Sequence, residues 1–179
     1  MPRLFTGLEI PASVAFALSL KRGGLPGARW IDAENYHITL RFIGDVDYAT
    51  ASEIEAGLEK LANGLSFSVK LTQLGAFGGN KPHALYAGAA LNDSLVRLQA
   101  AHERILQRIG LDPEGRKYTP HVTLARLRGT APEELARYLA GAGRFEPLEF
   151  PVGRFVLFSS RDSVGGGPYV VEQSYPLAA

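Results

Sequence analysis

The sequence contains no cysteine, and only one methionine and one tryptophan among its 179 residues. The lack of cysteine excludes disulfide bonds and every metal site that depends on a thiolate ligand. No stretch approaches the roughly 18 consecutive apolar residues of a membrane-spanning helix, and the N-terminus alternates instead of forming the apolar block of a secretion signal. We therefore expect a soluble, cytoplasmic protein that does not bind a membrane.

The chain also has almost no net charge, because 19 lysines and arginines nearly balance 18 aspartates and glutamates. This balance argues against a protein whose whole surface wraps nucleic acid, but it is compatible with a local basic cleft. With 46% hydrophobic and 21% charged residues, the composition is that of a globular protein. We expect a single domain of two intimate lobes over residues 1–179, which buries about 70% of the surface of its unfolded chain.

One short pattern occurs twice: His37-Ile38-Thr39-Leu40, and 84 residues later His121-Val122-Thr123-Leu124. Side chains alternate between the two faces of a strand, so the His and Thr of each copy share one face and the apolar residues take the other. The apolar face is suited to a core, and the polar face to chemistry. Two such strands predict a duplicated architecture in which each half contributes one histidine to a common cleft.

The other elements follow from apolar periodicity, capping residues, proline and glycine. Helices are expected at 11–20, 48–62, 93–109 and 132–139. Strands are expected at 4–10, 67–71, 84–89, 121–127, 145–150, 153–159 and 169–175, besides the strand of the first motif and a short extended piece at 29–31. A loop is expected at 75–82. This mixture of helices and strands in two similar halves predicts an α+β fold.

Histidine has an unperturbed pKa of about 6.5 and can donate or accept protons near neutral pH. A histidine acid and a histidine base on two sides of a phosphorus atom can split a phosphodiester without a metal, and each proton transfer contributes roughly 10²–10⁴-fold. The threonine hydroxyls can donate hydrogen bonds to the non-bridging phosphate oxygens. One copy would be weak evidence, because a lone histidine is more often structural; the matching second copy indicates function.

The other histidines are expected to have different roles. No two histidines form a close i, i+4 pair, and no carboxylate lies beside either motif at ligand spacing, so a metal site is disfavoured. His102 falls on the apolar stripe of its helix and is predicted to be a core or boundary residue. His83, at a junction of loop and strand, is predicted to be a solvated loop residue, with a substrate contact as the alternative.

Two glycine-rich stretches, Gly78-Gly79 and Gly165-Gly166-Gly167, match neither a phosphate-binding loop nor a dinucleotide fingerprint. They are predicted to be turns or a rim of the cleft. The pair Ser159-Ser160 lacks the context of a nucleophile elbow, which makes a serine hydrolase improbable.

Basic residues gather around the second motif: four lie between positions 116 and 128, with no acidic residue. Such a cluster attracts phosphate even in a nearly neutral protein. By strand alternation Arg41 shares the face of His37 and is predicted to contact phosphate. Arg126 has the opposite parity from His121 and can reach the same site only through a bulge or a strand end.

Aromatic residues next to the motifs are candidates for stacking on a nucleobase. They are Phe42 and Tyr118, with Tyr36 as a further candidate. The alternative for each is a place in the core, which is commoner for aromatic residues in strands.

The motifs and their flanks resemble a known family. Paired His-x-Thr-x motifs define the two-histidine (2H) phosphoesterases, and the flanks are similar to those of the bacterial and archaeal RNA 2′,3′-cyclic phosphodiesterases, historically called 2′-5′ RNA ligases. The segments that carry the resemblance are Arg3-Leu4-Phe5, 35–44, Leu74-Gly75-Ala76-Phe77, 120–126 and Phe158-Ser159-Ser160-Arg161. The sequence departs from the family pattern at 82–86, where Arg or Val and Trp are more usual.

The resemblance implies a bilobal α+β fold, with two pseudo-symmetric lobes whose antiparallel sheets line a central cleft, and no metal or other cofactor. It implies hydrolysis of RNA 2′,3′-cyclic phosphate ends to 2′-phosphomonoesters, with 2′-5′ RNA ligation as a reverse activity. His37 would be the proton donor and His121 the proton acceptor, while Thr39 and Thr123 would hold phosphate oxygens. The expected partner is RNA with such ends, and we expect a monomer.

Two alternatives stay open. The same fold could act on small cyclic nucleotides, ADP-ribose cyclic phosphate or 2′-5′-linked oligonucleotides. A second alternative is a module that binds RNA ends without turnover, although binding alone does not require two titrating histidines.

Overall fold

A computed structural model describes residues 2–160 and 167–178 of the chain. In chain order its elements are β1 (Arg3–Glu9), α1 (Ala12–Ser19), β2 (Ala28–Trp30), the 3-10 helix η1 (Ala33–Asn35), β3 (His37–Asp45), α2 (Tyr48–Glu59), β4 (Phe67–Phe77), β5 (Ala84–Ala89), α3 (Asp93–Ile109), β6 (His121–Leu127), α4 (Pro132–Gly141), β7 (Leu148–Val152), β8 (Arg154–Ser160) and β9 (Tyr169–Pro176). Each predicted helix and strand is present. The predicted turn at Gly165 and Gly166 lies outside the described residues.

Two predicted boundaries are wrong. The expected loop at 75–82 begins only after Phe77, because residues 75–77 of β4 pair with β5. The expected strand at 145–150 starts later and includes Pro151, which pairs with Ser68 of β4. Proline is tolerated there because β7 is at the edge of the sheet, where a missing backbone donor costs no ladder hydrogen bond.

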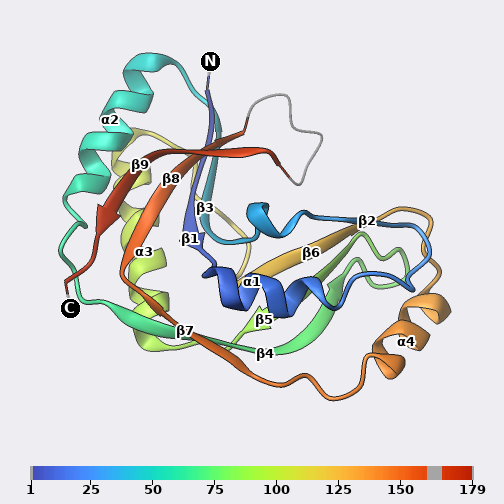
Figure 1. Cartoon of the computed structure of the whole chain (residues 1–179). Coiled ribbons are helices and arrows are strands. Elements are labelled where there is room, and N and C mark those ends of the chain that lie inside the picture. Colours follow the sequence, from blue (N-terminus) through green and yellow to red (C-terminus); the bar gives the residue numbers. More distant parts are fainter. Residues whose placement is uncertain (1, 161–166, 179) are drawn as a thin grey trace.

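The strands form one antiparallel sheet that consists of two halves (Figure 1). The order is β7-β4-β5-β6-β3-β1-β8-β9, with β2 paired to β6. Strands β3 and β6, which carry the two motifs, are joined by one residue pair, Ile38 with Val122. Four strands of this order therefore lie on each side of a narrow joint, with β2 as a fifth strand on the β6 side, and the joint lies between the two His-x-Thr sequences.

The predicted duplication is visible in this order, but the two lobes exchange strands. In each half, the strand next to the motif strand precedes it in the sequence, with a helix between them: β1, α1 and β3, then β5, α3 and β6. The next strand outward follows the motif strand of the other half: β4, which comes after β3 and α2, pairs with β5, and β8, which comes after β6 and α4, pairs with β1. Each lobe is thus completed by a strand that lies outside its own sequence half.

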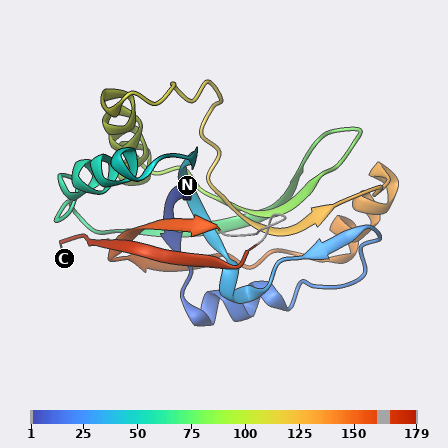
Figure 2. The ribbon, with the colours of Figure 1, turned by 90° about the horizontal axis from the view of Figure 1, so that it is seen from above.

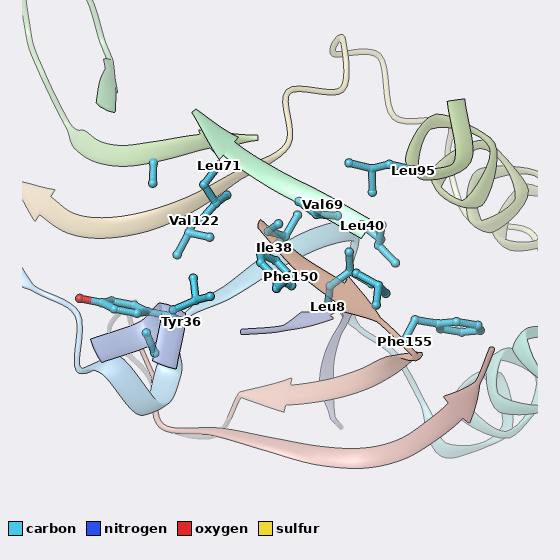
Figure 3. Packing of buried hydrophobic residues seen from close by; sticks show 14 of the residues in the cluster. Leu8, Tyr36, Ile38, Leu40, Val69, Leu71, Leu95, Val122, Phe150 and Phe155 are labelled. Atoms are coloured by element: carbon cyan, nitrogen blue, oxygen red, sulfur yellow. The ribbon is translucent and has the colours of Figure 1, made fainter. Parts of the chain in front are cut away.

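The apolar residues of the two motifs form the centre of the core, as predicted. Ile38, Val122 and Leu124 are completely buried, and Leu40 nearly so. Figure 3 shows Ile38 and Val122 among the packed side chains of this core. Burial of each such side chain contributes about 1.5–3 kcal/mol relative to an exposed one, so the core anchors both motif strands and leaves their polar faces free.

Helix α3 closes part of this core. Its N-cap is Asn92, whose side chain accepts a hydrogen bond of 2.8 Å from the backbone of Leu95, and the left-handed Gly110 (φ +114°) ends it. His102 is fully buried beside Phe155, which confirms its prediction as a core residue. Helices α2 and α3 lie side by side, away from α1 and α4 (Figure 2). In the described part of the chain, no helix combines the length and apolar character needed to cross a bilayer.

Candidate active site

The two motifs meet through their middle residues. Ile38 pairs with Val122 in antiparallel register, so the residues on either side of this pair turn to the opposite face. Continuing the register places His37 beside Thr123, and Thr39 beside His121. Each histidine therefore neighbours the threonine of the other motif, and the four polar side chains share one face of the joined sheets.

This face is hollowed into a cavity of about 700 Å³. All eight residues predicted for catalysis or substrate binding line it: His37, Thr39, Arg41, Phe42, Tyr118, His121, Thr123 and Arg126. The structure brings together residues from both lobes, as expected from the duplicated motif. Their individual contacts differ, however, from the predicted ones in several cases.

Both histidines are held by the same type of hydrogen bond. Nδ1 of His37 lies 3.0 Å from the carbonyl oxygen of Asn35, and Nδ1 of His121 lies 2.6 Å from that of Thr119. A carbonyl oxygen can only accept, so Nδ1 carries the hydrogen in both rings. In the neutral ring the lone pair is therefore on Nε2, and this nitrogen is available for proton transfer.

The two Nε2 atoms have different surroundings. Nε2 of His37 lies 3.1 Å from Oγ1 of Thr39, whereas Nε2 of His121 makes no hydrogen bond to any described residue. A free lone pair on His121 is suited to accept a proton from water. The structure thus breaks the symmetry of two motifs that look alike in the sequence.

Aromatic rings surround each histidine from its own lobe. His37 contacts Phe5, Phe158 and Tyr169 at ring-centroid distances of 4.9, 5.5 and 5.0 Å. His121 contacts Phe77 and Tyr86, at 4.8 and 5.4 Å. These rings restrict the orientation of the imidazoles and cover part of each ring from water.

Burial changes the proton affinity of both histidines. Burial is the main reason why the pKa of His37 is lowered to about 4. The charges of His121 and Arg126 lower this pKa as well, whereas the hydrogen bond to Asn35 raises it but is outweighed. Burial and the charge of Arg126 also lower the pKa of His121. In the empty site both rings are therefore neutral at pH 7, and one of them can act as a base.

A bulge at the same position of both motifs decides which later side chains reach the cavity. Thr6 pairs with Arg41 but Gly7 pairs with Thr39, so Leu40 is an extra residue in β3. In β6, Leu124 is the extra residue between the partners of Leu85 and Tyr86. Beyond each bulge the side chains change face.

Strand alternation alone would turn Arg126 to the face opposite His121. The bulge at Leu124 explains why Arg126 nevertheless reaches the cavity. Arg126 is exposed, lines the cavity, and its charge acts on the pKa of both His37 and His121. Phe42 holds the equivalent position in the first motif and is 51% exposed. The bulge thus directs one cation and one aromatic ring to the active face.

The same bulge turns Arg41 away from its predicted role. Arg41 is only 7% exposed, pairs with Glu103, and donates to the carbonyl oxygen of Asp112 at 2.5 Å. Burial raises the pKa of Glu103, but hydrogen bonds from Arg41, Gln107 and the backbone of Glu114 outweigh this and lower the pKa to about 2. These contacts favour a structural role for Arg41 over the predicted phosphate contact.

Tyr118 also has a contact that the sequence does not reveal. Its ring lines the cavity, while its hydroxyl donates a hydrogen bond of 2.9 Å to the carbonyl oxygen of Thr39. Tyr36, the further stacking candidate, is a buried core residue. The exposed ring of Phe42 is therefore better placed than either tyrosine to stack on a base.

Comparison with known proteins agrees with this geometry. The family model described as LigT like Phosphoesterase matches residues 8–86 and 89–169, two segments that each contain one of the motifs.

The chain belongs to the LigT-like phosphoesterase family.

Curated relatives and a solved structure support this assignment. The RNA 2′,3′-cyclic phosphodiesterase of Aeropyrum pernix is 38% identical over 62% of this chain and 63% of its own length, so the aligned region spans less than two thirds of that relative. The RNA 2′,3′-cyclic phosphodiesterase of Thermotoga maritima is 32% identical over 85% of this chain and 80% of its own. The crystal structure of TT0787 of Thermus thermophilus has a TM-score of 0.81 at 24% identity and 97% coverage of both chains. The predicted bilobal fold and family membership are thus confirmed.

Within the described residues of this LigT-like phosphoesterase, no group of three or more His, Cys, Asp or Glu side chains is arranged to hold a metal ion. The polar groups that line the cavity include imidazoles, hydroxyls and cations, with Glu114 as its one carboxylate among the described residues. These groups suit a phosphate anion as ligand.

The sequence prediction missed the residues that support the histidines. Phe5, Phe77 and Phe158 lie in segments that carry the resemblance to LigT-like phosphoesterases, but no role followed from their positions. Tyr86 fits against Gly75, where a Cβ atom would lie 2.6 Å from the tyrosine oxygen. His83 is exposed, as expected of a solvated loop residue, and it also lines the cavity.

Proposed function

We propose that the protein hydrolyses 2′,3′-cyclic phosphate ends of RNA to 2′-phosphomonoesters, with His37 as proton donor and His121 as proton acceptor. The observation that carries the proposal is the pairing of Ile38 with Val122, which brings the two motifs to one cavity. The names of the relatives support the class of substrate. Because one chain supplies both histidines, we infer that residues 1–179 act as one domain and as a monomer.

In the proposed reaction, water attacks the phosphorus atom while the bond from phosphorus to the 3′ oxygen breaks. Nε2 of His121, which makes no hydrogen bond to a described residue, removes a proton from the water. His37 gives a proton to the departing 3′ oxygen. The products are a 3′ hydroxyl and a 2′-phosphomonoester, and the two histidines exchange their protonation states.

His37 has to carry a proton when the substrate is bound. Burial lowers its pKa to about 4 in the empty site, but a phosphate anion placed beside Nε2 favours the charged form and raises the pKa again. Substrate binding and protonation of His37 are therefore coupled. The bound phosphate thus favours protonation of His37, which becomes the acid, while the more accessible His121 remains neutral and can act as the base.

Charge on the phosphate oxygens is stabilised by the groups that converge on the cavity. Thr39 and Thr123 can donate hydroxyl hydrogen bonds to non-bridging oxygens. Arg126 adds a positive charge that is close enough to lower the pKa of both histidines. Phe42 supplies a ring on which the terminal base can stack, and Tyr118 also lines the cavity.

The scheme assigns no step to a metal ion, because side chains supply both proton transfers and the charge stabilisation. The same groups also permit ligation. If the 5′ hydroxyl of a second RNA replaces water, its attack with loss of the 3′ oxygen forms a 2′-5′ linkage, and the proton transfers are unchanged.

A panel of substrates tests the proposal and its alternatives. Purified protein in excess EDTA is incubated with an RNA that ends in a 2′,3′-cyclic phosphate, with adenosine 2′,3′-cyclic phosphate, with ADP-ribose 1″,2″-cyclic phosphate and with 2′-5′-linked triadenylate. We expect the highest kcat/KM with the RNA. Faster turnover of another member would replace the substrate, and binding of all four without turnover would show a non-catalytic module.

A further inference from the structure

We propose that His83 and Arg126 form a second phosphate subsite, which binds the phosphate on the 5′ side of the terminal nucleotide. This inference rests on the proposed function, and it assigns a direction to the RNA strand in the cleft. The cavity of about 700 Å³ is much larger than one cyclic phosphate, and it extends past both motif strands. A strand of RNA can therefore leave the reaction centre toward either of two ends.

The cations at these ends have different neighbours. Toward β1 and the end of β3, Arg3 is paired with Asp45 and Arg116 with Glu114, each at 3.2 Å. Lys117, next to Arg116 in the sequence, also lines the cavity and has no ion pair among the described residues. At the other end, Arg126 has no carboxylate within ion-pair distance among the described residues. Its positive charge is therefore available for a phosphate.

His83 lies next to Arg126 on the neighbouring strand. Ala84 pairs with Arg126 in the β5–β6 ladder, and the carbonyl oxygen of His83 accepts a hydrogen bond of 2.9 Å from the backbone of Leu127. The side chain of His83 is exposed and lines the cavity. Two nitrogen donors from adjacent strands thus face the same end of the cleft.

The imidazole of His83 is also held in place. Its ring stacks on Phe77 at 6.3 Å and 20°, and Phe77 in turn contacts His121 at 4.8 Å. The turn before it fits closely, because a Cβ atom on Gly78 (φ +111°) would lie 2.8 Å from the His83 ring. Phe77 thus contacts both His83 and His121, which places His83 next to the reaction centre.

Three substrates isolate the 5′ phosphate. Adenosine 2′,3′-cyclic phosphate lacks it, 5′-phosphoadenosine 2′,3′-cyclic phosphate carries it as a terminal group, and ApA ending in a 2′,3′-cyclic phosphate carries it as an internucleotide linkage. We expect His83→Ala to reduce kcat/KM about tenfold for the last two, through KM, because one hydrogen bond to a charged group is lost. We expect less than a twofold change for the first substrate.

Control variants define the result. Lys81→Ala removes a charge from the same turn but not from the cavity lining, so it should not change the ratio between the substrates. His83→Gln keeps an N–H donor and should retain part of the preference.

Equal losses on all three substrates, or no loss, would overturn the subsite. A loss on ApA alone would show a nucleoside contact instead, and a selective loss in Lys117→Ala but not in His83→Ala would show that the strand runs the other way.

Failure of this inference differs from failure of the proposed function. If the wild-type protein turns over none of the three substrates, the proposed function fails. If it turns them over and His83→Ala does not distinguish them, only the subsite fails.

Discussion

The hydroxyl group of Tyr118 donates a hydrogen bond of 2.9 Å to the backbone carbonyl oxygen of Thr39. This bond joins the segment that leads into the second motif to the strand of the first. Burial raises the pKa of Tyr118, so its hydroxyl stays protonated and remains a donor. Together with the pair of Ile38 and Val122, this bond connects the two halves beside the cavity.

Removing this hydroxyl should affect catalysis more than binding. Tyr118→Phe keeps the ring and is expected to cost about 1 kcal/mol of unfolding free energy, together with a several-fold loss in kcat at unchanged KM, because the two motifs lose a common restraint. Tyr138→Phe is the matched control, since Tyr138 donates a similar bond of 2.7 Å to Lys21 outside the cleft. Equal kcat values for both variants would contradict a positioning role for Tyr118.

Substitution of the two arginines should separate activity from stability. Arg126→Ala removes an exposed charge in the cavity and should lower kcat/KM about 10²-fold, with less than about 0.5 kcal/mol change in unfolding free energy. Arg41→Ala leaves the largely buried Glu103 without its partner and should cost about 3 kcal/mol. Arg128→Ala, an exposed charge outside the cavity, is the control for Arg126. A stable Arg41 variant with the larger kinetic defect would reverse our assignment of the two residues.

The lowered pKa values of the histidines predict an acid-shifted rate profile. Burial places the pKa of His37 at about 4 and brings that of His121 below its usual 6.5. The reaction needs one proton on the pair, so kcat/KM, which reports the free enzyme, should be maximal below pH 6.5 and fall above it. The kcat profile should lie at higher pH, because bound phosphate raises the pKa of His37. A kcat/KM that stays constant from pH 6.5 to 8.5 would contradict this assignment of the pKa values.

His102 should make stability depend on pH in a different way. Burial lowers its pKa to about 4, and among the described residues its Nε2 has no hydrogen-bond partner. In the unfolded chain His102 takes up a proton as the pH falls below about 6.5, whereas in the folded chain it stays neutral until about pH 4. The free energy of unfolding therefore has its full value above pH 6.5 and decreases as the pH falls toward 4. His102→Leu should reduce this loss by about 3 kcal/mol, as measured by urea unfolding at pH 4 and pH 8. An unchanged difference between the two pH values would show that His102 is not the responsible group.

The strand alternation of the two motifs was sufficient to predict that their polar side chains meet at one cavity. Ile38 and Val122 are buried, and the histidines and threonines share one face, because a half-buried strand has a period of two. The capping residues of α3 likewise follow from local chemistry. These features depend on neighbours in the sequence.

The features that the sequence did not reveal depend on the partner strands. The bulges at Leu40 and Leu124 shift the later residues by one position, which buries Arg41 and exposes Arg126. The consecutive apolar pair Leu124-Ala125 breaks the alternation and was a usable signal in the second copy. In the first copy, the charge of Arg41 conceals the same bulge. The exchange of β4 and β8 between the lobes has no local signal, because pairing of distant strands is set by the whole fold.

The most direct test of the account is the hydrolysis of an RNA with a 2′,3′-cyclic phosphate end by the wild-type protein, His37→Ala and His121→Ala, with the products identified and kcat measured in EDTA. The account predicts a 2′-phosphomonoester from the wild type and a loss of at least about 10²-fold in kcat for each variant, with melting temperatures that stay close to wild type. A 3′-phosphomonoester as the product, or a kcat near that of the wild type in either variant, would contradict it.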